Sequence, residues 1–147
     1  RKKSAPDLFD VVNRSQDAPS EIYLSDENKY YKKMEALASS NDKDRLFQIR
    51  QVEARAIRPN SCPTLTANMG LGGHNVPFVF DKKGLRRLTV EECMRLQGFD
   101  PASFSIPEKI RDNAMLQMIG NAVSVGTVQT IISGLIEQSI LMEISGE

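Results

Sequence analysis

The chain has 147 residues, of which 40% are hydrophobic and 26% are charged, and its formal net charge is zero. With nine glycines, seven prolines and two cysteines, it has the composition of a soluble globular domain, which excludes collagen-like chains, low-complexity chains and disulfide frameworks. No run approaches the roughly 18 apolar residues of a membrane span. We therefore expect no membrane contact and a reducing, cytoplasmic setting.

The zero net charge conceals an uneven distribution of charged residues along the chain. Residues 43–95 carry 10 basic and 5 acidic side chains, a net +5, whereas residues 1–42 are at −1 and residues 96–147 at −4. A basic middle third is typical of a surface that binds a polyanion such as nucleic acid. A solvated face with scattered arginines is the alternative interpretation, and charge alone favours this second one.

The first 42 residues are predicted to form an arm followed by one helix. Residues 1–20 contain two prolines and only a short apolar cluster, which favours an extended arm or one short strand. A helix from about 26 to 38 is then predicted, because an acidic segment is followed by apolar residues at helical spacing. These residues are Tyr30, Tyr31, Met34, Leu37 and Ala38.

The basic middle third is predicted to be rich in β-structure. Alternating apolar and basic residues over 45–58 indicate a strand or hairpin with a basic face. Residues 64–66 are expected to form a short strand that runs into the sequence MGLGGHN. The glycines of that sequence predict an irregular loop whose backbone can approach a partner closely. Residues 76–80 and 85–88 are predicted to be two further strands.

Three helices are predicted after these strands. Thr89 and Glu92 fit the capping box that begins a helix, and Gly98 marks the end of that helix. A second helix is expected over 111–118, and a third from about 124 to 142. The third helix has large aliphatic residues on one face, and such a face needs a partner surface. They are Val128, Ile131, Ile132, Leu135, Ile136 and Ile140.

The sequence holds no recognisable catalytic constellation. The single histidine, His74, cannot be tested against a triad, and no glycine-rich nucleotide motif follows a strand. Cys93 is expected to be a core thiol, and Cys62 is also expected to be structural although it lies near basic residues. The hydroxyls of Thr64 and Thr66, the glycine-rich backbone and the arginines are groups that contact a DNA backbone. An ordinary surface loop is the alternative.

Three segments of the sequence resemble the C-terminal part of bacterial DNA (cytosine-5)-methyltransferases. They are PTLTANMGLGGHNVP at 63–77, LRRLTVEECMRLQGF at 85–99 and IGNAVSVGTV at 119–128, in the order found in that family. The resemblance covers residues 45–142. It implies an α+β fold: a small β-rich target recognition lobe with short helices, and a C-terminal amphipathic helix that normally packs on a Rossmann-like methyltransferase domain.

The resemblance also implies how the chain is divided. Residues 1–42 form the arm and helix that lead into the lobe. Residues 43–110 form the target recognition domain, including the block RRLTVEECMRLQGF that organises it. Residues 111–147 form the C-terminal helices with the cofactor-side motif IGNAV.

Site residues follow from the same resemblance, position by position. Asn121 and Ala122 match residues that touch S-adenosylmethionine, which we do not expect this chain to bind alone. Arginine is the expected base reader, because its planar fork matches a guanine edge. No catalytic and no metal-binding residue is expected. The DNA-binding candidates are Arg50, Arg55, Arg58, Thr64, Thr66, Asn68, Gly72, Gly73, His74 and Asn75.

The catalytic motifs of the family are missing from these residues. There is no Phe-x-Gly-x-Gly loop, no Pro-Cys and no Glu-Asn-Val, so we expect this chain to be inactive alone. We expect its partners to be duplex DNA and an N-terminal catalytic domain, in the same polypeptide or as a separate subunit of a restriction-modification enzyme. A homodimer through the last helix is a further expectation. The alternative function is a non-catalytic DNA-binding or regulatory module with this fold.

Overall fold

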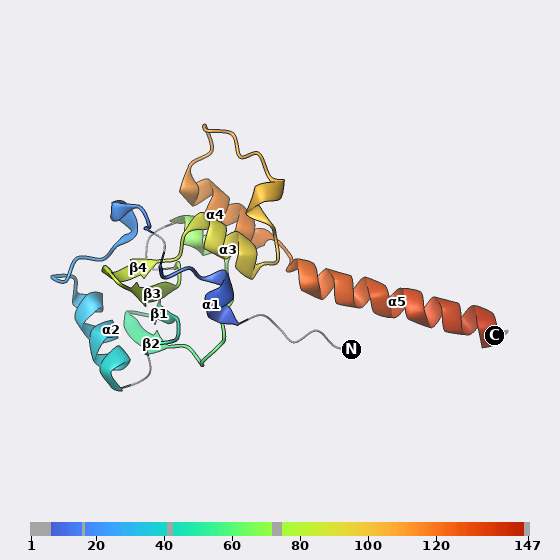
Figure 1. Ribbon diagram of the computed structural model, residues 1–147, viewed down its shortest axis with the longest axis horizontal. Helices are drawn as coiled ribbons and strands as arrows, with labels where there is room; N and C mark the ends of the chain where they lie inside the picture. The colour runs from blue at the N-terminus through green and yellow to red at the C-terminus, as the bar shows by residue number, and fades with distance from the viewer. Residues whose placement is uncertain (1–6, 16, 41–42, 72–74, 146–147) are drawn as a thin grey trace.

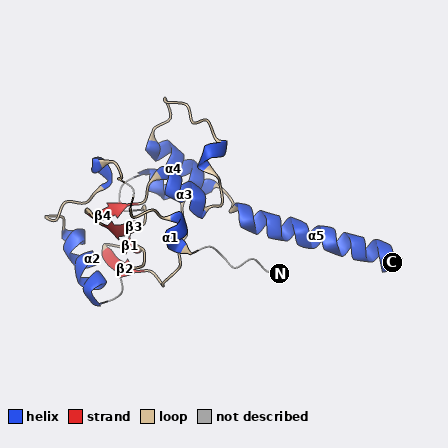
Figure 2. Ribbon diagram, viewed as in Figure 1, coloured by secondary structure: helices blue, strands red, loops and turns tan. Residues whose placement is uncertain are grey.

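The computed structural model describes residues 7–15, 17–40, 43–71 and 75–145, with side chains up to Met142. A small antiparallel sheet lies at the centre, and helices surround it (Figure 2). Its strands run in the order β2-β1-β3-β4. Their bounds are Phe47–Arg50 for β1, Glu53–Ala56 for β2, Phe78–Asp81 for β3 and Gly84–Arg87 for β4.

One face of the sheet packs against helix α2 (Lys29–Ser40). Because side chains alternate across a strand, Phe47 and Ile49 of β1 point to this face and meet Tyr30 and Met34 of the helix. The helix begins at Lys29 rather than 26, since the Asn28 side chain accepts a hydrogen bond from the Tyr30 amide at 2.9 Å. The predicted helix is therefore confirmed, with its start three residues later.

The other face of the sheet packs against the remaining short helices. The core there joins Leu46 and Val79 of the strands to Leu8, Met94 and Leu116. The helices that supply it are α1 (Leu8–Val11), the 3₁₀ helix η2 (Ala67–Leu71), α3 (Val90–Leu96) and α4 (Asp112–Asn121). The sheet is thus covered on both faces, and the predicted α+β class is confirmed.

The structure differs from the prediction at the N-terminal arm. Residues 8–11 form a helix, not a strand, because Asp7 caps it: the Asp7 side chain accepts from the Phe9 amide and the Asp10 side chain accepts from the Asp7 amide. A short 3₁₀ turn, η1 (Ser20–Ile22), follows. Residues 1–6 lie outside the described residues.

The predicted strand over 64–66 is also wrong. This segment is not part of the sheet and lies instead against α4, where Gly120 leaves room for it. A Cβ atom at Gly120 would lie 2.2 Å from the Thr66 carbonyl oxygen, and one at Gly70 would lie 2.4 Å from the Asn113 carbonyl oxygen. Gly70 also differs from the prediction of an irregular loop, because it lies within the 3₁₀ helix η2.

The predicted capping box is confirmed at α3. The Thr89 hydroxyl accepts from the Glu92 amide at 3.1 Å, and the Glu92 carboxylate accepts from the Thr89 amide at 2.8 Å. Gly98 follows the helix with φ of +88°, a conformation that favours glycine. The loop that follows contains one more 3₁₀ turn, η3 (Pro101–Ser103).

The last helix, α5 (Val125–Ser145), extends away from the rest of the molecule (Figure 1). It is tied at its start, where the Val125 amide donates to the Gln97 carbonyl at 2.9 Å. The stretch Asp112–Met142 is long and apolar enough to cross a membrane by length and composition alone. The buried core helix of a soluble protein passes the same test, so the expectation of no membrane contact stays a prediction.

Candidate nucleic-acid interface

The β1–β2 hairpin carries two of the candidate arginines on one side. The register places Gln48 opposite Arg55 and Arg50 opposite Glu53. By the alternation of side chains these four residues lie on the opposite side of the strands from Phe47 and Ile49, and Glu53, on the edge strand, is still within reach of α2. Both arginines are exposed. The Arg55 guanidinium donates to the Gln48 amide oxygen, with 3.2 Å from its Nε, so Arg55 is oriented by its neighbour.

The turn of this hairpin has an unusual backbone. Gln51 and Val52 have φ of +49° and +63°, as in the two-residue turns whose twist matches a hairpin. Such values are uncommon for residues other than glycine and rarest for β-branched ones. Val52 is 65% exposed, so the conformation is not explained by burial of its side chain. The turn presents an apolar tip beside Arg50.

The second group of candidates lies on the segment that packs on α4. Thr64 and Thr66 are exposed, and Leu65 between them is buried at 9% exposure. The outward alternation of the two hydroxyls is therefore confirmed, although no strand produces it. The Asn75 side chain donates to the Asn68 carbonyl at 2.9 Å. Gly72, Gly73 and His74 lie outside the described residues.

The two groups are positioned by different parts of the fold. The hairpin forms one edge of the sheet, whereas η2 lies beside α4 (Figure 1). Arg58 is exposed in the connection between them. Within the described part of the chain, no hydrogen bond or ion pair joins the hairpin arginines to the threonine and asparagine segment. The two groups of candidates are thus positioned independently, by different elements.

The close approach at Gly120 joins the second group to the predicted cofactor side. Gly120 contacts the backbone of Thr66 and Ala67, and the next residue, Asn121, ends α4 with an exposed side chain. Ala122 is half-buried, and its carbonyl accepts from the Gln97 side chain at 3.5 Å. The packing places the candidate DNA and cofactor residues side by side.

Several basic residues of the middle third are already paired. Lys82 and Lys83 lie 3.4 and 3.0 Å from Asp17, and these hydrogen bonds hold the pKa of the Asp17 carboxyl below its usual range. Arg95 pairs with Glu91 at 3.1 Å. Because Asp17 lies outside residues 43–95, its pairing with the two lysines means that the excess of +5 overstates the charge that this region offers to a partner.

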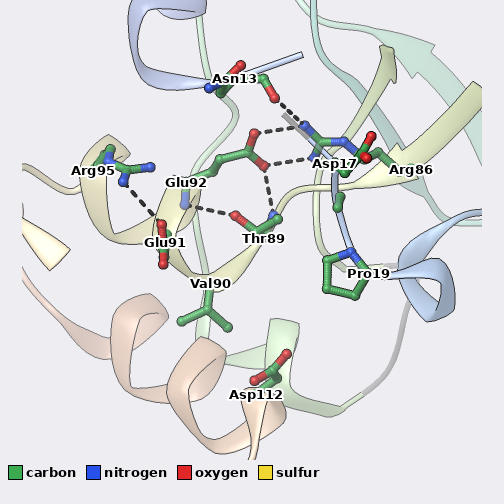
Figure 3. Close-up of a pocket in the computed structure, with 11 residues that line it drawn as sticks. Asn13, Asp17, Pro19, Arg86, Thr89, Val90, Glu91, Glu92, Arg95 and Asp112 are labelled. Atoms are coloured by element: carbon green, nitrogen blue, oxygen red, sulfur yellow. Dashed lines mark hydrogen bonds and ion pairs between the residues drawn. The ribbon is translucent and has the colours of Figure 1, made fainter. Parts of the chain in front are cut away.

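Arg86 is also paired, but unlike the residues above it is buried, at 1% exposure. Figure 3 shows its guanidinium beside Glu92. Its Nη atoms each lie 2.8 Å from a Glu92 oxygen, and its Nε lies 2.8 Å from Asp81. The Asn13 and Arg87 carbonyls accept the remaining N–H groups. All five donors of the guanidinium are satisfied, which explains how a charge is tolerated there. Sequence reasoning counted this arginine as surface charge.

The polar cavity around Arg86 is accounted for by these contacts. Its volume is about 230 Å³. The hydrogen bonds that Asp81 accepts from Tyr23 and Arg86 outweigh the effect of burial and lower the pKa of its carboxyl. Burial and the bond to Asp81 raise the pKa of Tyr23 to about 12. The charged side chains bind one another. They form a structural ion cluster that holds α3 on the sheet, and the cavity lies beside this cluster.

Neither cysteine is prepared to act as a nucleophile. Burial raises the pKa of the half-buried Cys62 to about 12, and burial also raises the pKa of Cys93, which is fully buried. A thiolate is the reactive form, so both thiols are inert at neutral pH. Among the described residues, no group of three or more His, Cys, Asp and Glu side chains is placed to hold a metal ion.

Comparison with known proteins gives the family. Residues 6–137 match the C-5 cytosine-specific DNA methylase family, and the chain belongs to that family. It is similar to Type II methyltransferase M.Bsp6I of Bacillus sp. (strain RFL6), with 35% identity over 125 residues. The aligned region is 84% of this chain and 38% of that protein, so the chain spans well under half the length of this relative. No solved structure matches the chain.

Proposed function

We propose that this chain is the DNA-binding, target-recognising C-terminal portion of a DNA (cytosine-5)-methyltransferase of a restriction-modification system, acting in the cytoplasm. The complete enzyme transfers a methyl group from S-adenosylmethionine to carbon 5 of a cytosine in duplex DNA. One observation carries the proposal: a chain of the methylase family presents its arginines and threonine hydroxyls to solvent. The groups concerned are Arg50, Arg55, Arg58, Thr64 and Thr66.

The three-part division of the chain remains part of this proposal. Residues 43–110 recognise the target, residues 1–42 support them, and residues 111–147 link recognition to the cofactor. Support for the last role comes from the packing of Gly120 on Thr66. A change in the DNA-facing segment is transmitted directly to Asn121, because no side chain separates the two backbones.

S-adenosylmethionine would be held only in part by these residues. The exposed Asn121 amide fits a polar group of the cofactor, whereas Ala122 offers a half-buried methyl and a carbonyl already bonded to Gln97. The cofactor supplies the methyl group to the reaction. The rest of its pocket and the nucleophile would lie outside these residues, since burial raises the pKa of both cysteines here.

Helix α5 is the surface that we assign to this second portion, a Rossmann-like catalytic domain. Its aliphatic side chains are exposed, from 38% at Val128 to 65% at Leu141. An apolar groove of about 320 Å³ between α3, α4 and the loop after α3 adds to it, lined by Met94, Phe99, Phe104, Ile106, Pro107 and Met118. Exposed apolar patches of this kind mark protein interfaces. A homodimer through α5 is the competing arrangement.

Binding of the chain to a randomised duplex pool at two salt concentrations tests the proposal. We expect enrichment of a short motif that contains a cytosine, with affinity that falls as salt rises. Variants of a base-reading arginine relax the motif at one position, whereas variants of Lys82 or Lys83, which Asp17 already pairs, weaken all sequences alike and only slightly. Absence of binding at low salt would contradict the proposal. Binding without methyl transfer once the catalytic portion is supplied would favour a non-catalytic DNA-binding module.

A further inference from the structure

Glu53 occupies an unfavourable place for a DNA-binding hairpin. It is exposed on the face of β2 that also carries Arg55, and it lies directly opposite Arg50 in the register. Opposite charges at such positions normally pair across the strands. A pair between Glu53 and Arg50 would occupy the guanidinium, and a free carboxylate would repel phosphate groups. Either arrangement weakens the hairpin as a DNA-binding element.

The structure shows neither arrangement, because a third residue takes the carboxylate. Lys33 of α2 lies 2.9 and 3.0 Å from the two oxygens of Glu53, and its Nζ also donates to the Val52 carbonyl at 3.5 Å. Arg50 makes no hydrogen bond or ion pair within the described part of the chain. The acidic group is therefore neutralised from the side of the helix.

Lys33 can do this because α2 is firmly placed. Tyr30, Met34 and Ala38 are buried against the sheet, and Lys33 precedes Met34 on the same helix. Its long side chain reaches the edge strand β2, so the contact joins the supporting helix to the end of the hairpin. The same contact with the Val52 carbonyl holds the turn in which both central residues have positive φ.

We propose that Lys33 is a positioning residue of the DNA interface: it holds Glu53 away from Arg50 and thereby leaves the Arg50 guanidinium for DNA. This inference rests on the proposed function and extends it to a residue outside the recognition lobe. Loss of Lys33 releases Glu53, which then pairs with Arg50. The hairpin loses the arginine contact although the arginine itself is unchanged.

Affinity for duplex DNA measures the effect. We expect Lys33→Met to weaken binding about fivefold, of the order of one exposed ion pair, and Glu53→Gln to restore it in the Lys33→Met background. In a background that carries both Arg50→Met and Glu53→Gln, so that neither the guanidinium nor a free carboxylate is left, Lys33→Met should add no further loss. Lys32→Met is the matched control: it removes the same charge from the neighbouring exposed position of α2 and should show no coupling to Glu53→Gln.

The outcomes separate this inference from the proposed function. If the wild-type chain does not bind DNA, the proposed function fails and the inference fails with it. If the wild type binds but Lys33→Met with Glu53→Gln stays as weak as Lys33→Met alone, the inference alone is wrong. A further loss from Lys33→Met in the background with both Arg50→Met and Glu53→Gln would also overturn it, because Lys33 would then contact DNA itself.

Discussion

Large apolar side chains are buried in the sheet and its covering helices, which we call the body, but are exposed on helix α5. In the body, Met34, Phe47 and Leu85 are fully buried between the sheet and its helices. On α5, eight large apolar side chains between Val128 and Met142 are from 38% to 65% exposed. Each buried aliphatic or aromatic side chain contributes roughly 1.5–3 kcal/mol to stability, and α5 gains none of this from the body.

The contrast shows that the body packs its core within these residues, whereas α5 does not pack its apolar face. Among the described residues, no buried side-chain nitrogen or oxygen lacks a hydrogen-bond partner. The buried polar groups of the body are therefore satisfied within the described residues. Helix α5 keeps its backbone hydrogen bonds but not its packing, and helices depend mainly on packing for their stability. An exposed apolar helix of this kind supports the proposal that α5 packs on a second protein surface.

The largest expected effect in the body comes from the ion cluster. Arg86→Leu leaves the carboxylates of Glu92 and Asp81 without their partner at nearly zero exposure. Removal of one member of such a buried pair costs about 3–5 kcal/mol. Urea denaturation should show this loss in the free energy of unfolding. The control Glu137→Gln, on exposed α5, should change that free energy by less than about 0.5 kcal/mol.

Glycine substitutions sharpen the comparison between the two regions. At Gly120 a Cβ atom would lie 2.1 Å from the Thr66 carbonyl carbon, whereas at Gly134 nothing lies within 4 Å. We expect Gly120→Ala to destabilise the body by about 1–3 kcal/mol through overpacking. Gly134→Ala should leave it unchanged and raise the helix content of α5, which circular dichroism measures. Equal effects of the two variants would contradict the close approach at Gly120.

A fall in pH should lower the stability of the body through protonation of Asp81. The pKa of this carboxyl is lowered in the folded state, so its ionised form contributes stability above the unfolded value of about 4. That contribution is lost as the pH falls through the folded pKa. The free energy of unfolding should therefore decline below about pH 4. Asp81→Asn should flatten this decline, and an unchanged slope in that variant would show that other carboxyls cause it.

The smallest effect on stability is expected on α5 itself. Leu135→Ser removes an apolar side chain that is 58% exposed, and surface changes of this kind stay within about 0.5 kcal/mol. Association with the catalytic portion should weaken strongly in the same variant, which sedimentation of the mixture measures. If the chain alone changes from dimer to monomer on this substitution, the homodimer is the arrangement that α5 serves.

Local signals in the sequence predicted local structure well. The capping box of Thr89 and Glu92 and the hairpin over 45–58 depend on neighbours within a few residues, and both are present. The alternation of exposed threonines and buried Leu65 over 64–66 is also typical of a strand, but alternation alone does not supply a neighbouring strand to pair with. The actual place of this segment depends on Gly120, more than 50 residues later.

The sequence predicts which residues of the candidate site are exposed better than it predicts how they are arranged in space. The threonines and Arg50 are exposed as expected. Burial of Arg86 was missed, although Glu92 of the capping box and Asp81 across the β3–β4 turn were visible as potential partners. The Asn13 carbonyl, 73 residues away, completes the cluster, and no spacing rule reveals such a contact. Lys33 was missed for the same reason, since it reaches Glu53 from another element.

Amide hydrogen exchange of the chain with and without duplex DNA tests the central claim most directly. We expect DNA to slow exchange in the β1–β2 hairpin and over 64–71, while α5 exchanges equally fast in both states, because the proposed function assigns DNA binding to the body and another protein surface to α5. Slower exchange confined to α5, with the hairpin and the threonine segment unchanged, would contradict this division of roles.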